Sequence, residues 1–377
     1  MKILHLLYSQ QISGAEKNLL DLLPGLSAAG VECHLIVVTR PEDEHKFIRY
    51  VEEIKDKNIK VTLMTCKSRY ILTAKEINSY LKKNDIHYIH SHLFRSDMLA
   101  VMIKKLYNKK VYLISTRHGY QEKFFKKFHL LNKKNENTFY HFLSRFLLRH
   151  INKHMAVSKA IADLYLDLHL IKKPITIIHH GVNLSLFADQ EQLECKKTAN
   201  QIIIVGRLET IKGHQFFFKA LPTVLEKFPD AQLIIMGDGK EKNNLKKLAK
   251  SLDIEKSINF LGFQPQPFLF IAQSEIMLQT SLYESFGLVF IEAFALKTPV
   301  IAFDVPAGNE IIINNETGIL VPLFDIKVLS EKIIYLLENP SERKRIAENA
   351  YKKFEEYYNA QRMVDETVAW YQTFVTD

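Results

Sequence analysis

Cysteine and long apolar runs are both scarce in this chain of 377 residues. Its three cysteines, Cys33, Cys66 and Cys195, lie far apart, are odd in number and have no metal-binding spacing, which favours a reducing compartment. No apolar run reaches the roughly 18 residues of a membrane span. The N-terminal stretch MKILHLLYSQ has a short apolar run and lacks a small-residue cleavage site, unlike a signal peptide. We therefore expect a cytoplasmic protein.

Several catalytic and binding signatures are also missing. There is no Gly-x-Ser-x-Gly elbow, no His-Glu-x-x-His motif and no reactive-cysteine signature, so hydrolase chemistry by those routes is not supported. A net charge of +9 and a pI near 9.1 indicate anionic partners. Nucleic acid is not the expected partner, because no helix-turn-helix, zinc or RNA-binding signature accompanies the charge.

Part of the basic excess is concentrated in one segment, from Lys123 to His154. It contains eight Lys or Arg residues against one acid, Glu136, interleaved with Phe, Leu and Tyr. Such a mixture can lie on an anionic bilayer, aromatic side chains down and cations on the headgroups, which would place the chain at the inner face of the membrane. The alternative is a pair of amphipathic helices whose basic face is merely solvated.

The chain is organised as two similar halves. Short apolar runs alternate with amphipathic segments throughout, which indicates βα units, parallel sheets and an α/β fold with two Rossmann-like, doubly wound domains. The polar stretch at residues 188–201 is the candidate linker. We expect domains at residues 1–187 and 188–355, facing each other across a cleft, and a C-terminal helix at 356–377 that packs back on the first domain. Ligands bind at the carboxyl ends of strands in such sheets.

The stretch GRLETIKG at residues 206–213 follows a strand and precedes a helix. It offers two cations, Arg207 and Lys212, beside loop amides and a helix start, where an anion such as a diphosphate is favoured. It is not a Walker A loop, and the alternative is two ordinary surface cations. Farther on, Gly237 and Gly239 form a lone Gly-x-Gly, for which close turn packing is a better explanation than a dinucleotide.

In the first half, Gly14 follows the first strand and lets the backbone approach a ligand, unless it forms an ordinary turn. The histidines His87, His90 and His92 suggest a metal site. On a strand only His90 and His92 share a face, and no Cys or carboxylate completes the set, so we expect no metal. His118, at the end of another strand, is the better candidate for a site residue.

The stretch LYESFGLVFIEAFA, residues 282–295, contains two glutamates eight positions apart. If the chain is helical from Gly287 onward, Glu292 has no polar face around it and requires either an internal cation or the hydroxyl groups of a ligand. Glu284 would precede the helix, with Ser285 as a candidate cap.

Taken with their neighbours, these residues resemble a known family. The spacing Glu284-x7-Glu292 is similar to the Glu-x7-Glu motif of the retaining GT-B glycosyltransferases of family four. Five other stretches match that family in order and spacing: HGVN at 180–183, GRLETIKG, IIMGDG at 234–239, INFLGF at 258–263 and NETGILVP at 315–322. The resemblance covers nearly the whole chain and is densest between Met155 and Pro322.

The resemblance implies that the second domain binds a nucleoside-diphosphate sugar and the first a glycan or lipid-linked acceptor. Arg207 and Lys212 would hold the diphosphate, Glu292 the ribose, and Glu284 the transferred sugar. Gly14 would approach the phosphates, and His118 the reacting sugar. The remaining donor-binding residues that the resemblance implies are Gly206, Ser285, Phe286, Gly287, Leu288 and Asn183.

The implied activity is transfer of a hexose-type sugar, UDP-linked, in polysaccharide or glycolipid biosynthesis, without a cofactor or metal. A front-face reaction with retention is the favoured hypothesis, because the sequence supplies no obvious nucleophile. The chain departs from the family at Ser13, where a glycine is common, and at VPAGNE, residues 305–310. A nucleotide-sugar epimerase and a non-catalytic binding protein for nucleotide sugars or polyanions remain as alternatives.

Overall fold

A computed structural model describes residues 1–119, 139–183, 197–264 and 267–375. These residues divide into two compact units: unit 1 comprises Met1–Gly181 and Ala360–Asp377, and unit 2 comprises Val182–Asn359. The unit boundaries at 181/182 and 359/360 compare with expected boundaries at 187/188 and 355/356. Most of the expected linker, and residues 123–138 of the basic segment, lie outside the described residues.

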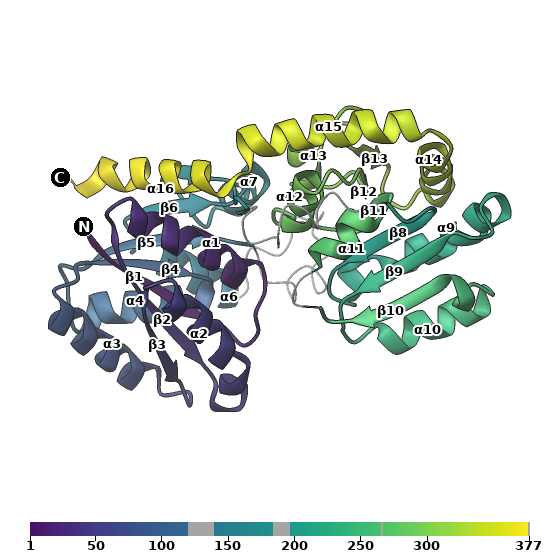
Figure 1. Cartoon of the computed structure of the whole chain (residues 1–377). Helices are drawn as coiled ribbons and strands as arrows, with labels where there is room; N and C mark the ends of the chain where they lie inside the picture. Colours follow the sequence, from purple (N-terminus) through teal and green to yellow (C-terminus); the bar gives the residue numbers. More distant parts are fainter. Residues whose placement is uncertain (120–138, 184–196, 265–266, 376–377) are drawn as a thin grey trace. The chain divides into compact units, whose positions relative to one another are not determined.

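Unit 1 contains a parallel sheet of seven strands in the order β3-β2-β1-β4-β5-β6-β7 (Figure 1). Its strands are β1 (Lys2–Tyr8), β2 (Glu32–Thr39), β3 (Lys60–Thr65), β4 (Tyr88–His92), β5 (Tyr112–Arg117), β6 (Lys153–Ala156) and β7 (Ile175–Ile177). Its helices are α1 (Gly14–Ala28), η1 (Pro41–Lys46), α2 (Ile48–Asp56), α3 (Tyr70–Asn84), α4 (Phe94–Leu106), α6 (Phe139–Leu148), α7 (Lys159–Asp167) and α16 (Ala360–Val375). The order reverses next to β1, which places the topological switch point between β1 and β4.

The strands of unit 1 are apolar because both faces of the sheet are covered. Ile3 and Leu7 of β1 belong to a core shared with α1, α2 and α16, whereas Leu4 and Leu6 are buried on the opposite face. Helix α16 is the last element of the chain, yet it packs against α1 and contributes Tyr371 to this core. The C-terminal helix therefore belongs to the same unit as the N-terminal strand.

Unit 2 repeats the arrangement with six parallel strands in the order β10-β9-β8-β11-β12-β13. The strands are β8 (Gln201–Val205), β9 (Gln232–Met236), β10 (Ile258–Gly262), β11 (Ile276–Gln279), β12 (Val300–Phe303) and β13 (Ile319–Val321). The helices are η4 (Thr210–Lys212), α9 (His214–Lys227), α10 (Lys242–Ser251), η5 (Glu255–Ser257), α11 (Phe268–Gln273), α12 (Leu288–Ala295), α13 (Gly308–Ile311), α14 (Ile326–Glu338) and α15 (Pro340–Tyr357). Each unit is thus a Rossmann-like α/β domain.

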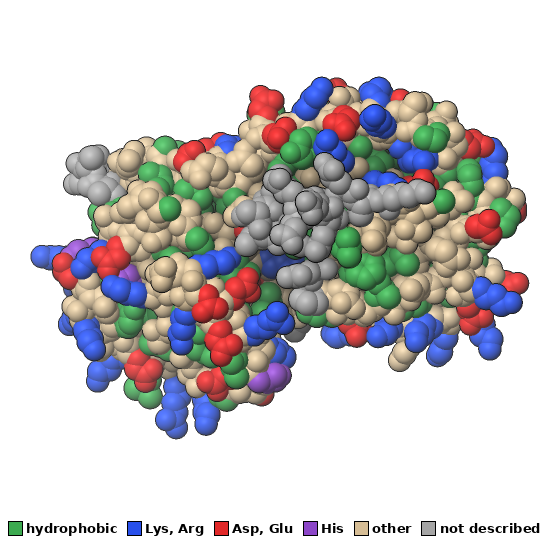
Figure 2. All heavy atoms as spheres, viewed as in Figure 1, with side chains coloured by type: hydrophobic (Ala, Val, Ile, Leu, Met, Phe, Trp, Pro, Cys, Tyr) green, Lys and Arg blue, Asp and Glu red, His purple; other side chains and the backbone are tan. Residues whose placement is uncertain are grey.

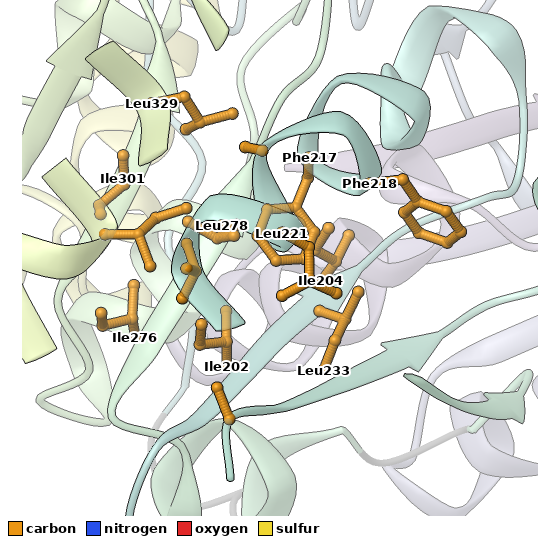
Figure 3. Packing of buried hydrophobic residues seen from close by; sticks show 14 of the residues in the cluster. Ile202, Ile204, Phe217, Phe218, Leu221, Leu233, Ile276, Leu278, Ile301 and Leu329 are labelled. Carbon is orange, nitrogen blue, oxygen red and sulfur yellow. The ribbon is translucent and has the colours of Figure 1, made fainter. Parts of the chain in front are cut away.

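The core of unit 2 is formed where α9 and α14 cover one face of the sheet. Figure 3 shows Phe217 and Leu221 of α9 lying over Ile204 and Leu278, the side chains of neighbouring strands. Fully burying one such side chain contributes about 1.5–3 kcal/mol, so this cluster fixes α9 and the loop before it against the sheet. That loop carries Arg207 and Lys212.

Candidate active site

The loop between β8 and α9 is held by close backbone packing. Gly237 has φ +143°, and a Cβ there would lie 1.9 Å from the carbonyl oxygen of Gly206. A Cβ at Gly239 would likewise lie 2.4 Å from the carbonyl oxygen of Leu208. The expectation that this Gly-x-Gly serves turn packing is confirmed.

Lys212 is the last residue of η4, and its backbone position is fixed on both sides. Gly213, with φ +65°, accepts a hydrogen bond at its carbonyl oxygen from the Thr280 hydroxyl at 3.0 Å. The carbonyl oxygen of Ile211 accepts from the amide of Leu282 at 2.8 Å. A Cβ at position 213 would lie 1.9 Å from the carbonyl oxygen of Thr280, so glycine is required for this approach.

Lys212 and Glu284 form a largely buried ion pair. The Nζ of Lys212 lies 2.6 Å from Oε1 of Glu284, and the two side chains are 18% and 8% exposed. The Nε2 of Gln279 donates to the same carboxylate oxygen at 2.9 Å and also lies 2.9 Å from the Ser281 hydroxyl. Burial alone raises the pKa of Glu284, but the Lys212 charge and these hydrogen bonds outweigh it and hold that pKa below its ordinary value.

Neither this ion pair nor the role of Gln279 follows from sequence spacing. The residue types were visible, since Gln279, Thr280 and Ser281 are the polar residues that end an apolar strand. What the sequence could not provide is the proximity of position 212 to position 284, which comes from two separate βα loops. The carboxylate keeps its charge, and the ammonium is held in one place, so both are preorganised for a polar ligand.

Glu292 lies on α12, as expected, and the other side chains of that helix are apolar. The residue is 5% exposed, and Phe290, Ile291 and Phe294 of the same helix are buried with it. Helix α12 begins at Leu288, with Gly287 as its N-cap at φ +92°. The interpretation of Ser285 as the cap is therefore wrong, because the chain passes through Phe286 and Gly287 before the helix starts.

The other predicted donor-binding residues of unit 2 lie in the same set of loops or at the start of the unit. Gly206 directly follows β8, Arg207 is exposed beside it, and Asn183 follows the first residue of the unit. The departure at residues 305–310 gives a loop before α13 in which Ala307 has φ +68°. A side chain with a Cβ is strained in that conformation, which glycine adopts freely.

Gly14 and His118 belong to unit 1. Gly14 is exposed and is the first residue of α1, where the amide of Ser13 donates to the Glu16 carboxylate at 2.8 Å. His118 follows β5, and its Nε2 lies 2.9 Å from Nδ1 of His92.

The expectation that His90 and His92 share a face of a strand and that His87 does not is confirmed. His87 is exposed beside Asp85, whereas His90 and His92 are buried on one face of β4. The third member of their group is His5 of β1, which sequence spacing could not reveal. One ring nitrogen from each of His5, His90 and His92 lies within 4.8 Å of the others.

Two family models match the chain in consecutive segments. The model for Glycosyltransferase Family 4 matches residues 12–186, and the model for Glycosyl transferases group 1 matches residues 187–353. The chain is 31% identical over 151 residues to an alpha-D-kanosaminyltransferase of Streptomyces kanamyceticus, an alignment that covers 40% of this chain and 39% of that enzyme. It is 25% identical over 298 residues to an N-acetyl-alpha-D-glucosaminyl L-malate synthase of Bacillus anthracis, covering 78% of this chain and 74% of that enzyme. The first of these alignments thus spans less than half of the relative's length.

Solved structures share the fold over the full length. HepE of Anabaena, crystallised with UDP and glucose, superposes with a TM-score of 0.82 and 18% identity, covering 99% of this chain and 100% of that one. A sucrose-phosphate synthase of Thermosynechococcus elongatus superposes with a TM-score of 0.80 and 20% identity, covering 100% of both chains. At these identities the similarity concerns the fold.

Proposed function

This chain belongs to the group 1 glycosyltransferases with a GT-B fold, and from that premise we propose that it moves a hexose-type sugar from a UDP-linked donor to a hydroxyl of a glycan or lipid-linked acceptor. The observation that supports this most directly is the preorganised pair of Lys212 and Glu284, held beside α12 by fixed backbone. HepE, which shares the fold, was crystallised with UDP and with UDP-glucose.

The charges of unit 2 suit each part of such a donor. When the anomeric carbon–oxygen bond breaks, the diphosphate leaves with additional negative charge, and Lys212 with Arg207 would stabilise it. Glu284 would accept hydrogen bonds from sugar hydroxyls, and Glu292 from the ribose. Two cations, of which Lys212 is held by its ion pair with Glu284, would supply the charge that a metal ion supplies in other sites, so we propose a metal-independent reaction.

We propose that the reaction retains the configuration of the sugar. The acceptor hydroxyl attacks from the face that the diphosphate leaves, the new carbon–oxygen bond forms as the old one breaks, and the hydroxyl proton passes to the departing phosphate oxygen. The group 1 model and the Glu284-x7-Glu292 spacing support this course.

A panel of nucleotide sugars tests the donor assignment. UDP-sugars at about 100 times the dissociation constant are expected to stabilise the chain by about 2.7 kcal/mol in thermal unfolding. Glu292→Ala should remove this stabilisation, because α12 supplies no other polar group. Glu226→Ala, an exposed residue of α9, is the matched control. Equal stabilisation of Glu292→Ala and the wild type would contradict the assignment, as would stabilisation by GDP- or ADP-sugars alone.

The proposed acceptor is lipid-linked because α6 presents an aromatic stripe to solvent. Phe139, Phe142 and Phe146 are 81%, 71% and 37% exposed, at the spacing of one helix face. Arg145 and Arg149 are exposed beside them, and the Arg149 guanidinium lies 4.7 Å from the ring centre of Phe146. Exposed aromatics flanked by cations suit the headgroup region of an anionic bilayer.

The face of unit 1 that Figure 2 shows carries charges of both signs. In Figure 2, Lys and Arg side chains on the visible face of unit 1 are interspersed with Asp and Glu. None of the helices in the described part of the chain is long and apolar enough to cross a membrane. We therefore propose peripheral contact through α6.

Vesicle co-sedimentation tests this contact. The chain should enrich on vesicles containing phosphatidylserine over pure phosphatidylcholine, and the double variant Phe139→Ser, Phe142→Ser should lose most of that enrichment because the buried apolar area disappears. Phe263→Ser is the matched control, since Phe263 is 67% exposed on unit 2. Equal sedimentation with both vesicle types would refute the membrane contact and leave the donor assignment untouched.

A further inference from the structure

Unit 1 contains a group of buried histidines that the proposed reaction does not account for. His5 lies on β1, His90 and His92 on β4, and His118 directly after β5, and parallel pairing places His5 beside His90. Their ring centres are 4.5–5.4 Å from one another along the group. Burial lowers the pKa of His5 and of His118 to about 3, with the Arg117 charge adding to the effect at His118, and burial also holds the pKa of His92 well below its ordinary value. At neutral pH each ring is neutral and carries one N–H.

Three of these rings form a continuous hydrogen-bonded chain. The Nδ1 of His5 lies 3.1 Å from Nε2 of His92, and the Nδ1 of His92 lies 2.9 Å from Nε2 of His118. His90 stands apart, because its two ring nitrogens are engaged by the hydroxyls of Tyr371 at 2.5 Å and Thr116 at 2.6 Å.

This geometry argues against a metal ion at His5, His90 and His92. The Nδ1 of His5 and the Nε2 of His92 are hydrogen-bonded to each other at 3.1 Å, so neither atom has a lone pair and an open direction left for an ion. His90 has no ring nitrogen left to offer without breaking a hydrogen bond. A hydrogen-bonded chain of imidazoles accounts for all of the observed contacts of these rings, whereas binding of a metal ion would require some of their hydrogen bonds to break.

A chain of three neutral imidazoles with two hydrogen bonds has only two proton arrangements. Either every ring donates toward His118, or every ring donates toward His5. The terminal nitrogens, Nε2 of His5 and Nδ1 of His118, are buried and have no hydrogen-bond partner among the described residues. The N–H that is left over must therefore lie at one end of the chain or at the other.

The two ends are not equivalent. His5 is completely buried in the core face of the sheet, whereas His118 is partly exposed. Orphaned N–H groups are rarer inside proteins than under-satisfied acceptors, so the bare nitrogen belongs at His5. His5 then donates to His92, His92 donates to His118, and the remaining N–H is on Nδ1 of His118, the ring that is partly exposed.

The loop that carries His118 is fixed on both sides. The Arg117 guanidinium lies 2.6 Å from the buried Asp97 carboxylate and 5.6 Å from the ring centre of Tyr165. The Tyr165 hydroxyl donates to the carbonyl oxygen of Gly119 at 3.1 Å. The ring of His180 stacks on that of His118 at 5.3 Å, so the position of the His118 ring is held.

We propose that His5 and His92 are positioning residues that fix the tautomer of His118, so that His118 offers Nδ1–H as a neutral hydrogen-bond donor to a hydroxyl or phosphate oxygen of the sugar substrate. That the ligand is a sugar substrate rests on the proposed function, whereas the assignment of the His118 tautomer does not. In this state His118 donates a hydrogen bond and does not act as a general base.

Nitrogen NMR of the full chain labelled with ¹⁵N-histidine reads the tautomer directly, with signals assigned from single His→Gln variants. In the wild type at neutral pH, His118 should have a protonated Nδ1 and a bare Nε2. His92→Phe should give a mixture of tautomers at His118, because the ring loses its only donor. His154 is a buried histidine of β6 that is not one of the three hydrogen-bonded rings. His154→Phe is therefore the matched control and should leave the tautomer of His118 unchanged. A wild-type His118 protonated on Nε2 would overturn the proposal even if His92→Phe failed to fold.

Kinetics and elemental analysis separate this proposal from the proposed function. His5→Phe and His92→Phe should lower kcat roughly tenfold with little change in the donor KM, because they disturb orientation rather than the donor site. If NMR shows the expected tautomer of His118 but the protein transfers no sugar, the proposed function is refuted and the role of His5 and His92 in fixing the tautomer is not. Unchanged kcat in both variants would overturn the positioning role, and stoichiometric zinc in the purified protein would overturn the imidazole chain.

Discussion

Replacing Lys212 by alanine is expected to lower kcat by two to three orders of magnitude, the range for removal of one preorganised charge-stabilising group. The backbone on both sides of Lys212 is held at Ile211 and Gly213, and the Glu284 carboxylate holds its ammonium, so the cation does not have to be oriented during the reaction. The change also leaves the Glu284 carboxylate, 8% exposed, without its counter-ion. Breaking a buried pair in this way costs about 3–5 kcal/mol, so the pKa of Glu284 should rise and binding of the sugar should weaken.

Steady-state kinetics with the donor found in the nucleotide-sugar panel measure this effect. Lys219→Ala, an exposed lysine of α9, is the control and should keep wild-type kcat. The double variant Lys212→Met, Glu284→Gln removes both charges. It should recover much of the stability lost in Lys212→Ala but none of the turnover, because no charge remains uncompensated yet the cation is still missing. A folded Lys212→Ala protein with wild-type kcat would refute the role of Lys212.

The sequence predicted the elements whose signal is local. The runs that form β1, β2, β4 and β5 are apolar and end in polar residues, so their positions could be predicted. This pattern is much weaker at β3 (Lys60–Thr65) and β7 (Ile175–Ile177). Both lie at the edges of the sheet and are mostly half-buried or exposed, which leaves a weak apolar pattern.

The contacts of the candidate site could not be predicted in the same way. Glu284 and Lys212 were both chosen from motifs, but their direct pairing depends on how two βα loops pack. His5 was not chosen at all, because its partner His92 lies 87 positions away along the chain, and His118, the partner of His92, lies 113 positions from His5. Sequence patterns report residue type and periodicity, whereas proximity across strands depends on register, which the sheet order supplies.

The buried histidines should also make unit 1 sensitive to acid. Burial holds the pKa of His5, His118 and His154 at about 3, whereas an unfolded histidine has a pKa near 6.5. Because the folded pKa is depressed, the unfolded state binds protons first. The stability is fully present above pH 6.5 and is lost as the pH falls toward 3. Once these three groups are protonated in the unfolded state, they lower the free energy of unfolding by about 4 kcal/mol per pH unit. The total free energy of unfolding of a protein is typically about 5–15 kcal/mol.

Tryptophan fluorescence during urea unfolding measures this loss in unit 1, because the single tryptophan, Trp370, is buried on α16 in the core of that unit. Between pH 6.5 and 5, before most carboxylates protonate, the urea midpoint should fall steeply. His154→Phe should flatten the dependence by about 1.4 kcal/mol per pH unit, the contribution of one proton. His87→Gln, a change at the exposed histidine of the same unit, should leave it unaltered. A midpoint that does not change across this range would show that these imidazoles are not held neutral in the folded state.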